Sequence, residues 1–361
     1  MLILSNDDIE QLLTMKDCLS VLEEVYRDFG EAKAISGPRC DILTPGPREG
    51  TYHGFKTMSG SAPCQGVTAV RITSDLIHWP TEAGVTRRVK IPKAGGNKYV
   101  GLVELFSIEN GEPLAIFPDG VMQRVRVGAA NGLGAKYLAR PDAGVVGLLG
   151  SGWQAGAQLT ALCEVRKIDK IKVFSPNPEK RNKFCAEMSE LLNVQVRPVH
   201  SAEEAVRDSD IVHCATNAVE PVMKGEWVGE GAHLGCIRHC ELDAASYQRS
   251  SVVFLHTKRQ IDPIHDVIGG GIEKIPELAK GWNHPEMQRA GVAWNSLPDV
   301  GDLLTGKAKG RSSAKEITCF VNNIGMGMQF AAVGGYVYKR ALAKGIGKEI
   351  PTEWFLQTVH P

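Results

Sequence analysis

The sequence lacks an excess of charge of either sign. Its 361 residues contain 41 Lys and Arg and 41 Asp and Glu, so the formal net charge at neutral pH is zero. A balanced charge gives no electrostatic reason to expect a nucleic acid or an anionic membrane as partner. We therefore expect neither a nucleic acid nor a membrane as partner.

Long apolar runs and a secretion signal are lacking too. No run reaches the ~20 apolar residues that a membrane-spanning helix needs. The first residues, MLILSNDDIEQLL, have neither a basic segment nor a small-residue cleavage site, so they do not resemble a signal peptide. Nine irregularly spaced cysteines are more typical of reduced thiols than of a disulfide framework. These features favour a cytoplasmic protein.

The chain contains two contrasting patterns, and its length favours two domains. Apolar residues recur at helical spacing over 6–34, and short β-rich runs between Gly and Pro over 37–116 predict a mixed, largely antiparallel sheet. An Ala- and Gly-rich helix is expected over 124–139 and a further helix over 313–344. From 143 onward strands alternate with helices, which predicts a doubly wound parallel sheet of the Rossmann type.

A glycine-rich turn follows the first strand of this alternating region. The sequence GLLGSGWQA places Gly150, Gly152 and Ala155 between an apolar strand and a helix. Such a turn lets a diphosphate approach the backbone at the helix N-terminus, whereas a turn that merely joins two elements is the alternative. The candidate cofactor-binding residues here are Gly150, Ser151, Gly152, Trp153, Gln154 and Ala155.

The next strand, KIKVF, ends without the acidic residue that NAD-binding folds usually place there for the ribose. Ser175 and Asn177 occupy this position, and Lys180 and Arg181 follow. The absent carboxylate and the nearby cations favour NADP(H), with NAD(H) as the alternative, although both cations could be ordinary solvated residues. Thr216, after the fourth strand, is also expected near the cofactor.

A basic segment interrupts the β-rich half of the chain. Residues 85–98 contain five Lys or Arg and no acidic residue. A solvated surface loop is one interpretation, and a flap over an anionic ligand is the other.

Several motifs resemble the ornithine cyclodeaminase/μ-crystallin family. They are DGVMQRVRVGAANGLGAKYLARP with VVGLLGSGWQAGAQ, then CATNAVEPVMKGEWVGEGAHL, LPDVGDLLTGKAKGR and EITCFVNNIGMG. The resemblance implies a homodimer with a discontinuous α+β substrate-binding and dimerisation domain, residues 1–125 and 318–361. It also implies that residues 126–317 form the Rossmann NAD(P)-binding domain.

The resemblance also implies which residues hold the carboxylate of the substrate. Arg39 and Arg126 match two arginines of the family, and Arg71 falls where the family has a lysine. Met58 supports that register, and Lys56 is the competing candidate for the lysine position.

One loop departs from the family pattern. Where relatives carry a catalytic Asp, this chain reads GAHLGCIRHCELD, so His239 or Glu241 could handle protons or could have no role. His233, Cys236, His239 and Cys240 also suggest a zinc site. In a strand, however, His233 and Cys236 would point to opposite faces, and we expect no metal.

We therefore expect an NAD(P)H-dependent oxidoreductase that transfers hydride at the C–N carbon of a small α-amino or α-imino acid, with Arg71, His239 and Glu241 as the catalytic candidates. One alternative is an ornithine or lysine cyclodeaminase, a lyase that uses bound NAD and releases ammonia. Another is a non-catalytic NADP-dependent protein that binds a small ligand.

Overall fold

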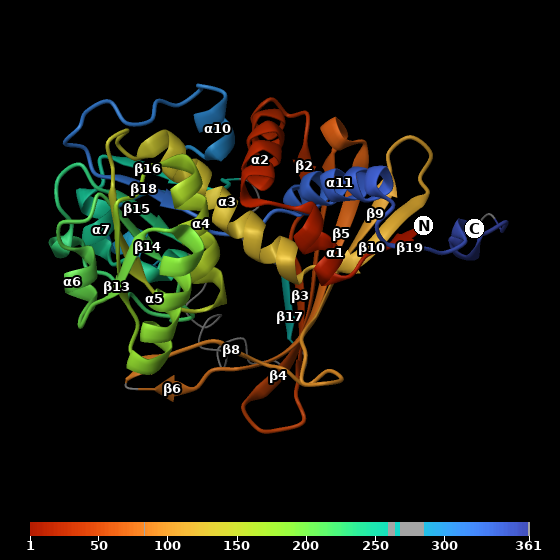
Figure 1. The fold of residues 1–361 in the computed structure, drawn as a ribbon, viewed down its shortest axis with the longest axis horizontal. Helices are drawn as coiled ribbons and strands as arrows, with labels where there is room; N and C mark the ends of the chain where they lie inside the picture. Colours follow the sequence, from red (N-terminus) through yellow and green to blue (C-terminus); the bar gives the residue numbers. More distant parts are fainter. Residues whose placement is uncertain (83, 259–263, 268–284, 360–361) are drawn as a thin grey trace.

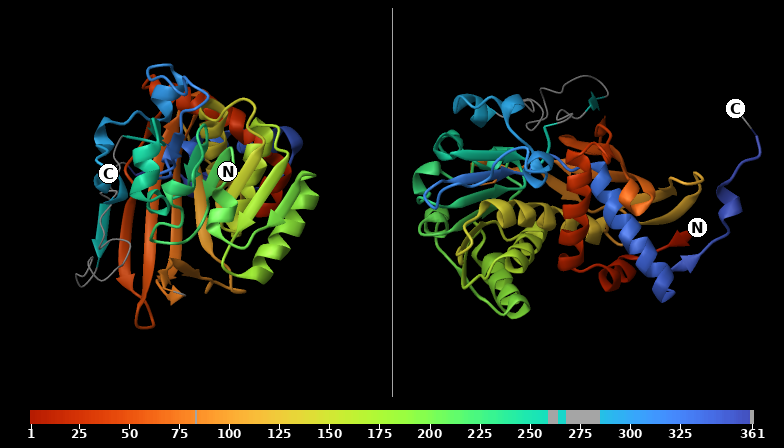
Figure 2. Two further views of the ribbon diagram at one scale, coloured as in Figure 1. Left: turned by 90° about the vertical axis from the view of Figure 1, so that its left-hand side faces the viewer. Right: turned by 90° about the horizontal axis from the view of Figure 1, so that it is seen from above.

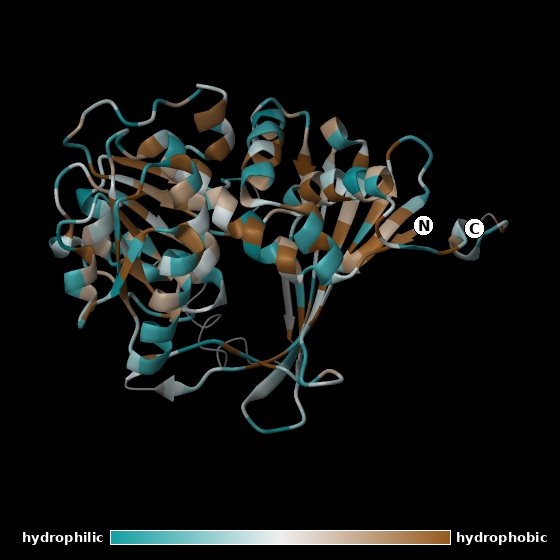
Figure 3. Cartoon of the chain, viewed as in Figure 1, coloured by the Kyte–Doolittle hydropathy of each residue, from teal (hydrophilic) through white to brown (hydrophobic). Residues whose placement is uncertain are grey.

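The computed structural model describes residues 1–82, 84–258, 264–267 and 285–359, which form two layered units side by side (Figure 1). One unit is built on a seven-stranded sheet and the other on a ten-stranded sheet. Apolar residues gather on the strands and on the helix sides that face them (Figure 3). None of the helices in the described ranges is long and apolar enough to cross a membrane.

The seven-stranded sheet confirms the predicted Rossmann arrangement. All its strands are parallel, in the order β13-β12-β11-β14-β15-β18-β16. The strands are β11 (Val145–Leu149), β12 (Lys170–Phe174), β13 (Gln195–Pro198), β14 (Ile211–Cys214), β15 (His233–Cys236), β16 (Val252–Leu255) and β18 (Thr318–Val321). The accompanying helices are α4 (Trp153–Val165), α5 (Pro178–Leu192), α6 (Ala202–Val206), α7 (Ala244–Arg249), α9 (Pro285–Arg289) and α10 (Val300–Leu304).

The ten-stranded sheet is mixed and largely antiparallel, as predicted. Its main path is β17-β3-β4-β5-β9-β10-β1-β19, with β2 paired to β4 and β8 paired to β5. The strands are β1 (Leu2–Ile3), β2 (Ile35–Ser36), β3 (Cys40–Pro45), β4 (Thr51–Ala62), β5 (Val67–His78), β8 (Val89–Ile91), β9 (Val100–Ser107), β10 (Pro113–Pro118), β17 (Ile264–Val267) and β19 (Lys348–Glu349). A small separate pair is formed by β6 (Thr81–Glu82) and β7 (Val85–Thr86).

The two faces of this sheet differ in what covers them. The helices α1 (Asn6–Leu12), α2 (Met15–Gly30) and α11 (Gly327–Lys344) lie on one side, and α11 packs directly on β4 and β5 (Figure 2). The other face exposes apolar side chains: Ile42 is 46%, Val100 40% and Leu102 37% exposed. This second face is therefore an apolar surface that is open in the single chain.

Helix α3 (Gly120–Leu138) joins the two units. It packs against α4 of one unit and α2 of the other. Gly128 permits this closeness, because a Cβ atom there would lie 2.5 Å from the carbonyl oxygen of Ala157 in α4. Arg126 lies in the first half of α3, and its side chain lines the cavity at the junction of the units.

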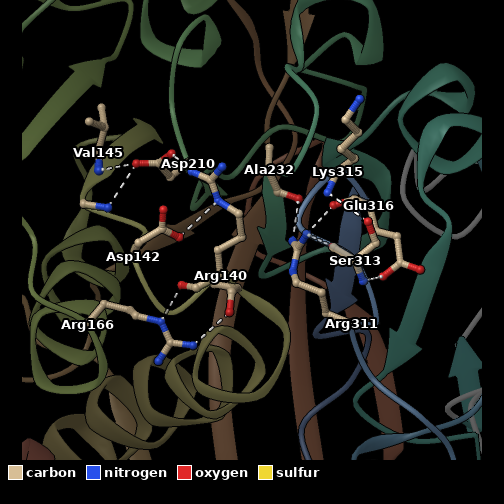
Figure 4. Close-up of polar contacts among 12 residues, drawn as sticks. Arg140, Asp142, Val145, Arg166, Asp210, Ala232, Arg311, Ser313, Lys315 and Glu316 are labelled. Carbon is tan, nitrogen blue, oxygen red and sulfur yellow. Dashed lines mark hydrogen bonds and ion pairs between the residues drawn. The ribbon is translucent and has the colours of Figure 1, made fainter.

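Three arginines fix the C-terminal end of α3 (Figure 4). Arg166 donates to the carbonyl oxygens of Ala135, Lys136, Ala139 and Arg140 at 2.8–3.0 Å. Arg311 donates to the carbonyl oxygen of Leu138, and Arg140 pairs with Asp210. The last carbonyls of a helix have no partner within the helix, so the side chains of Arg166 and Arg311 satisfy them, whereas Arg140 links the following segment to Asp210.

The strands differ from the expected boundaries in two places. The helix expected over 313–344 is a strand, β18, followed by α11 from Gly327, and β18 lies in the Rossmann sheet between β15 and β16. A short buried apolar run such as TCFV does not distinguish a strand from a helix by its periodicity. In addition, β17 pairs with β3 in the other sheet, although it falls within the expected Rossmann range.

Candidate functional site

A cavity of about 260 Å³ lies where the two units meet. All five residues predicted to bind the substrate line it, namely Arg39, Lys56, Met58, Arg71 and Arg126. They come from β4, β5, α3 and the segment before β3. Gln154, from the predicted cofactor turn, lines the same cavity. The structure therefore brings the predicted substrate residues and the glycine-rich turn to one place.

The cavity wall is strongly basic. Among the described residues that line it, Asp75 is the single acidic one and seven are basic: Arg39, Lys56, Arg71, Arg88, Lys90, Arg126 and Arg238. Such a lining favours an anionic ligand, because each cation gains Coulomb energy from it in a partly buried setting.

Two of these arginines are held by carboxylates. Arg39 makes a paired interaction with Asp41, with Nε–Oδ1 and Nη2–Oδ2 distances of 2.7 and 2.5 Å. Arg71 contacts Oδ2 of Asp119 through Nε at 2.7 Å and Nη2 at 2.6 Å. These ion pairs fix the orientation of both guanidinium groups at the cavity wall.

Arg126 differs from them because its partners are neutral. Its Nη1 donates to the Gln329 side-chain oxygen at 2.8 Å, and its Nη2 donates to that of Gln123 at 2.5 Å. Burial, together with the charge of Arg71, lowers the pKa of the Arg126 guanidinium. Both Arg71 and Arg126 lie over the ring of Phe330, at 5.0 and 4.9 Å from its centre. An anion bound between them would relieve their mutual repulsion.

Lys56 is a buried cation of the wall, as are Arg71 and Arg126. It lies in β4 and is 6% exposed. Within the described part of the chain, its Nζ has no hydrogen bond or ion pair. Burial, and then the charges of Arg88 and Arg39, lower the pKa of Lys56 well below its usual range. A negative charge bound beside Lys56 would favour its ammonium form.

The glycine-rich turn has the features of a diphosphate cradle. Gly150 has φ of +115°, and a Cβ there would lie 2.3 Å from the carbonyl oxygen of Ala215, so only glycine fits. Gly152 is the N-cap of α4, gives it no side-chain cap, and has no atom within 4 Å of an added Cβ. The turn is therefore uncrowded at Gly152, beside the first amides of α4, which is where such turns bind phosphate.

The remaining predicted residues of this turn have separate roles. Ala155 is fully buried and packs α4 on the sheet, whereas Trp153 is 53% exposed. Ser151 lies between the two glycines and is partly buried.

The end of β12 carries no carboxylate between Phe174 and Pro178. Asn177 caps α5 by accepting a hydrogen bond from the amide of Lys180 at 2.9 Å. Arg181 is buried and donates to the carbonyl oxygen of Ser175 at 2.7 Å. Ser175, Asn177 and Arg181 therefore form one compact corner, in which Arg181 organises the loop.

Glu241 takes a different place from the proton-transfer group that the sequence suggests. Its side chain is fully buried and is not among the described residues that line the cavity. The carboxylate accepts hydrogen bonds from the amide and hydroxyl of Thr216 and from the amides of Ile237 and Arg238, at 2.6–3.0 Å. Burial raises its pKa, and these hydrogen bonds act in the opposite direction. Glu241 thus joins the ends of β14 and β15.

The other residues of this loop are also placed by the structure. Thr216 lies beside the glycine turn, with its Cγ2 3.4 Å from a Cβ added at Gly150. His239 begins a short 3-10 helix, His239–Glu241, and does not line the cavity, whereas its neighbour Arg238 does. No group of three or more metal-ligating side chains occurs within the described ranges. His233 instead contacts the Thr318 hydroxyl at 2.9 Å.

The basic segment 85–98 contributes to the site. Arg88 and Lys90 line the cavity, and Lys90 pairs with Asp75 at 2.8 Å. The Arg88 amide donates to the carbonyl oxygen of Asn217, so the segment reaches the Rossmann unit. Sequence reasoning missed the individual roles of Arg88, Lys90, Gln123 and Arg238. Alternation along strand β8 would have placed Lys90 on the opposite face from Val89 and Ile91. The positions of Arg88, Gln123 and Arg238 at the cavity depend on the tertiary fold.

Comparison with known proteins identifies a family whose members resemble this chain over most of its length. The model of the ornithine cyclodeaminase/mu-crystallin family matches residues 84–345. The alanine dehydrogenase of Archaeoglobus fulgidus is 29% identical over 355 residues, which cover 97% of this chain and 98% of the relative.

Two solved structures also superpose on nearly the whole chain. The Δ1-pyrroline-2-carboxylate reductase of Thermococcus litoralis, in complex with NADH and L-proline, has a TM-score of 0.79 at 28% identity, with 97% of this chain and 100% of that chain covered. An archaeal alanine dehydrogenase dimer with bound NAD has a TM-score of 0.77 at 26% identity, with 97% and 99% covered.

Proposed function

Because this chain belongs to the ornithine cyclodeaminase/mu-crystallin family, we propose that it is an NAD(P)H-dependent oxidoreductase acting at the C–N bond of a small α-amino or α-imino acid. The observation that carries the proposal is the shared cavity, in which Gln154 of the glycine-rich turn and the basic side chains meet. The named relatives, an alanine dehydrogenase and a pyrroline-2-carboxylate reductase, both act on such acids.

The residues of the cavity have distinct tasks in this reaction. A bound nicotinamide dinucleotide would supply or accept the hydride. The turn at Gly150 and Gly152, with the first amides of α4, would hold its diphosphate. Arg71 and Arg126 would hold the α-carboxylate between them and fix the position of the α-carbon. A protonated imine already carries the positive charge that draws a hydride, so the absence of the family's catalytic Asp from the 234–241 loop does not prevent reduction.

The choice between the two nicotinamide cofactors is part of this proposal. The two solved relatives hold NADH and NAD. In this chain the end of β12 lacks a carboxylate for the ribose, which favours acceptance of the 2′-phosphate of NADP(H). We propose NADP(H) as the preferred cofactor, with NAD(H) as the alternative.

We also propose a homodimer that forms through the open face of the ten-stranded sheet. Ile42, Val100 and Leu102 expose apolar area on this face. The alanine dehydrogenase relative is a dimer. Contiguous apolar patches of this kind usually mark an interface.

The test is a measurement of NADH and NADPH oxidation with α-imino acids and with keto acid and amine pairs, with ammonia assayed in parallel. We expect consumption of reduced nicotinamide in proportion to the amino acid formed. Release of ammonia from ornithine or lysine without net change in nicotinamide would identify a cyclodeaminase instead. Tight cofactor binding without turnover of any tested compound would identify a binding protein.

Substitution of Arg126 tests the site itself. Arg126→Gln removes a charge-assisted contact of about 1.5–3 kcal/mol, so we expect KM for the imino acid to rise roughly 10- to 100-fold while cofactor affinity is unchanged. Lys136→Gln, in the exposed last turn of the same helix, is the matched control. Unchanged KM in Arg126→Gln would remove this residue from the substrate site.

A further inference from the structure

The cavity holds more positive charge than one α-carboxylate requires. Arg71 and Arg126 already provide two guanidinium groups beside the same Phe330 ring, which are sufficient to bind one carboxylate. Further basic side chains, Lys56 and Lys90 among them, line the same space. Buried cations are retained only where a negative partner offsets their desolvation.

The additional charge of Lys56 lies at a fixed spacing from Arg71, where the α-carboxylate is expected to bind. The register of β4 and β5 places Met58 opposite Arg71 and Lys56 opposite Thr73. Because residues two apart on a strand share a face and are separated by roughly 7 Å, Lys56 lies one row beyond Arg71 on the cavity wall. A chain of four or five carbon atoms with an acid at each end spans such a distance.

Lys56 is the group that most clearly lacks a partner. It is 6% exposed and lines the cavity, and in the described ranges its Nζ contacts no carboxylate. The carboxylates whose charge acts on Lys56, those of Asp41 and Asp75, are engaged by Arg39 and by Lys90. The positive charges of Arg88 and Arg39 lower the Lys56 pKa further, and an added carboxylate would offset them.

The cofactor diphosphate does not account for this charge. Its expected position is the N-terminus of α4, next to Gly150 and Gly152. Lys56 belongs to the other unit and lies in the middle of β4, on the face that carries Met58. The position of the surplus charge therefore points to the substrate.

We propose that the substrate carries a second carboxylate, which binds beside Lys56. The enzyme then acts on an acidic α-imino or α-amino acid of four or five carbons. This inference rests on the proposed function. In the reductive direction the protonated imine takes up a hydride at its α-carbon. The carbon–nitrogen π bond becomes the lone pair of the amine, and the reduced nicotinamide is oxidised. Arg71 and Arg126 hold the carboxylate next to the reacting carbon, and Lys56 holds the distal one.

The experiment compares 2-oxo acids with and without a second carboxylate. Oxidation of NADPH and NADH is followed with ammonia and pyruvate, 2-oxobutyrate, oxaloacetate or 2-oxoglutarate. We expect kcat/KM for a diacid to exceed that for the monoacids at least about tenfold, which corresponds to about 1.4 kcal/mol. In Lys56→Met we expect this preference to disappear. Lys93→Met, at an exposed position outside the cavity, is the matched control and keeps the preference.

A binding measurement separates this inference from the proposed function. Calorimetric titration with glutarate and butyrate, in the presence of oxidised cofactor, measures the anion site without turnover. We expect glutarate to bind at least about tenfold more tightly than butyrate, and Lys56→Met to remove the difference.

Three outcomes would overturn the proposal or its premise. Equal turnover of monoacids and diacids would overturn the second carboxylate and leave the proposed function intact. An equal loss of kcat with both classes in Lys56→Met would show that Lys56 serves the reaction itself and not the distal acid. If neither these 2-oxo acids with ammonia nor the α-imino acids are reduced, the proposed function fails, and equal affinity for glutarate and butyrate would then also overturn the distal site.

Discussion

At the scale of single residues, Glu241 shows how a buried carboxylate can shape a site that it does not enter. Its four hydrogen bonds hold Thr216 beside the glycine turn and hold Arg238 at the cavity wall. An amide in its place offers one acceptor oxygen to these donors and brings its own N–H groups, so the clamp is weakened.

We therefore expect Glu241→Gln to lower kcat/KM about tenfold or more while the pKa values that govern the pH–rate profile stay those of the wild type. The measurement is the pH dependence of kcat/KM for both proteins, with the exposed Glu226→Gln as control. Loss of one limb of the profile in Glu241→Gln would instead identify Glu241 as a proton-transfer group.

A buried histidine makes stability depend on pH. His213 in β14 is 1% exposed, and neither ring nitrogen has a hydrogen-bond partner within the described residues. Burial lowers its pKa to about 3, so the unfolded chain binds the proton more readily between pH 6.5 and 3. Its stabilising contribution is complete above about pH 6.5 and is lost as the pH falls through this window.

Between pH 7 and pH 5, His213 alone should reduce the free energy of unfolding by about 2 kcal/mol. We expect His213→Leu to remove this part of the pH dependence, as measured by urea unfolding at both values. His200→Leu, at an exposed position, should keep it. If the free energy of unfolding changed equally with pH in His213→Leu and the wild type, this histidine would not be the source of the pH dependence.

The sequence predicted the residues of the site that belong to continuous motifs. Arg126 and Gly150 are set by local helix and turn patterns, and both lie where expected. The roles of Gln123 and Lys90 could not be predicted, because they depend on contacts between strands and helices that are distant in the sequence. Glu241 was correctly placed in its loop, but its orientation depends on the amides that surround it.

At the scale of elements, α3 is held at its C-terminal end by arginine side chains and not by a capping glycine. Arg166 donates to two pairs of adjacent carbonyl groups, those of Ala135 and Lys136 in the last turn and those of Ala139 and Arg140 just after it. A cation at this position also interacts favourably with the helix dipole.

We expect Arg166→Met to lower the free energy of unfolding by about 2 kcal/mol, because hydrogen bonds from a charged donor are lost while the aliphatic part is kept. Thermal or urea unfolding measures this change. Lys167→Met, one residue further on and exposed, should have no effect. If the free energy of unfolding of Arg166→Met equalled that of the wild type, water would replace these hydrogen bonds without loss of stability.

Periodicity predicted the elements that are amphipathic or long, and it failed where a short strand is buried on both faces. Strand β18 is buried along its whole length, so its four residues carry no alternation. The helix expected there begins only at Gly327, after the strand has joined β15 and β16. The partner strands, and not the local sequence, decide the structure of this segment.

At the scale of the whole molecule, the open face of the ten-stranded sheet is the proposed dimer interface. We expect the wild type to be a dimer in light scattering, and Leu102→Glu to be a monomer, because a carboxylate on this face would be desolvated in the interface. Leu191→Glu, on exposed α5 of the other unit, is the control and should remain dimeric. A monomeric wild type would contradict the proposed interface.

The crossing of β17 to the edge of the other sheet, together with α3 between the units, ties the two halves of the chain to each other. Neither half is a self-contained unit. Excision of residues 126–317 would remove β17 from the ten-stranded sheet and would leave the seven-stranded sheet without β18. Recombination between relatives should thus succeed only when entire chains are exchanged, and a new specificity must be introduced by changing side chains within one intact scaffold.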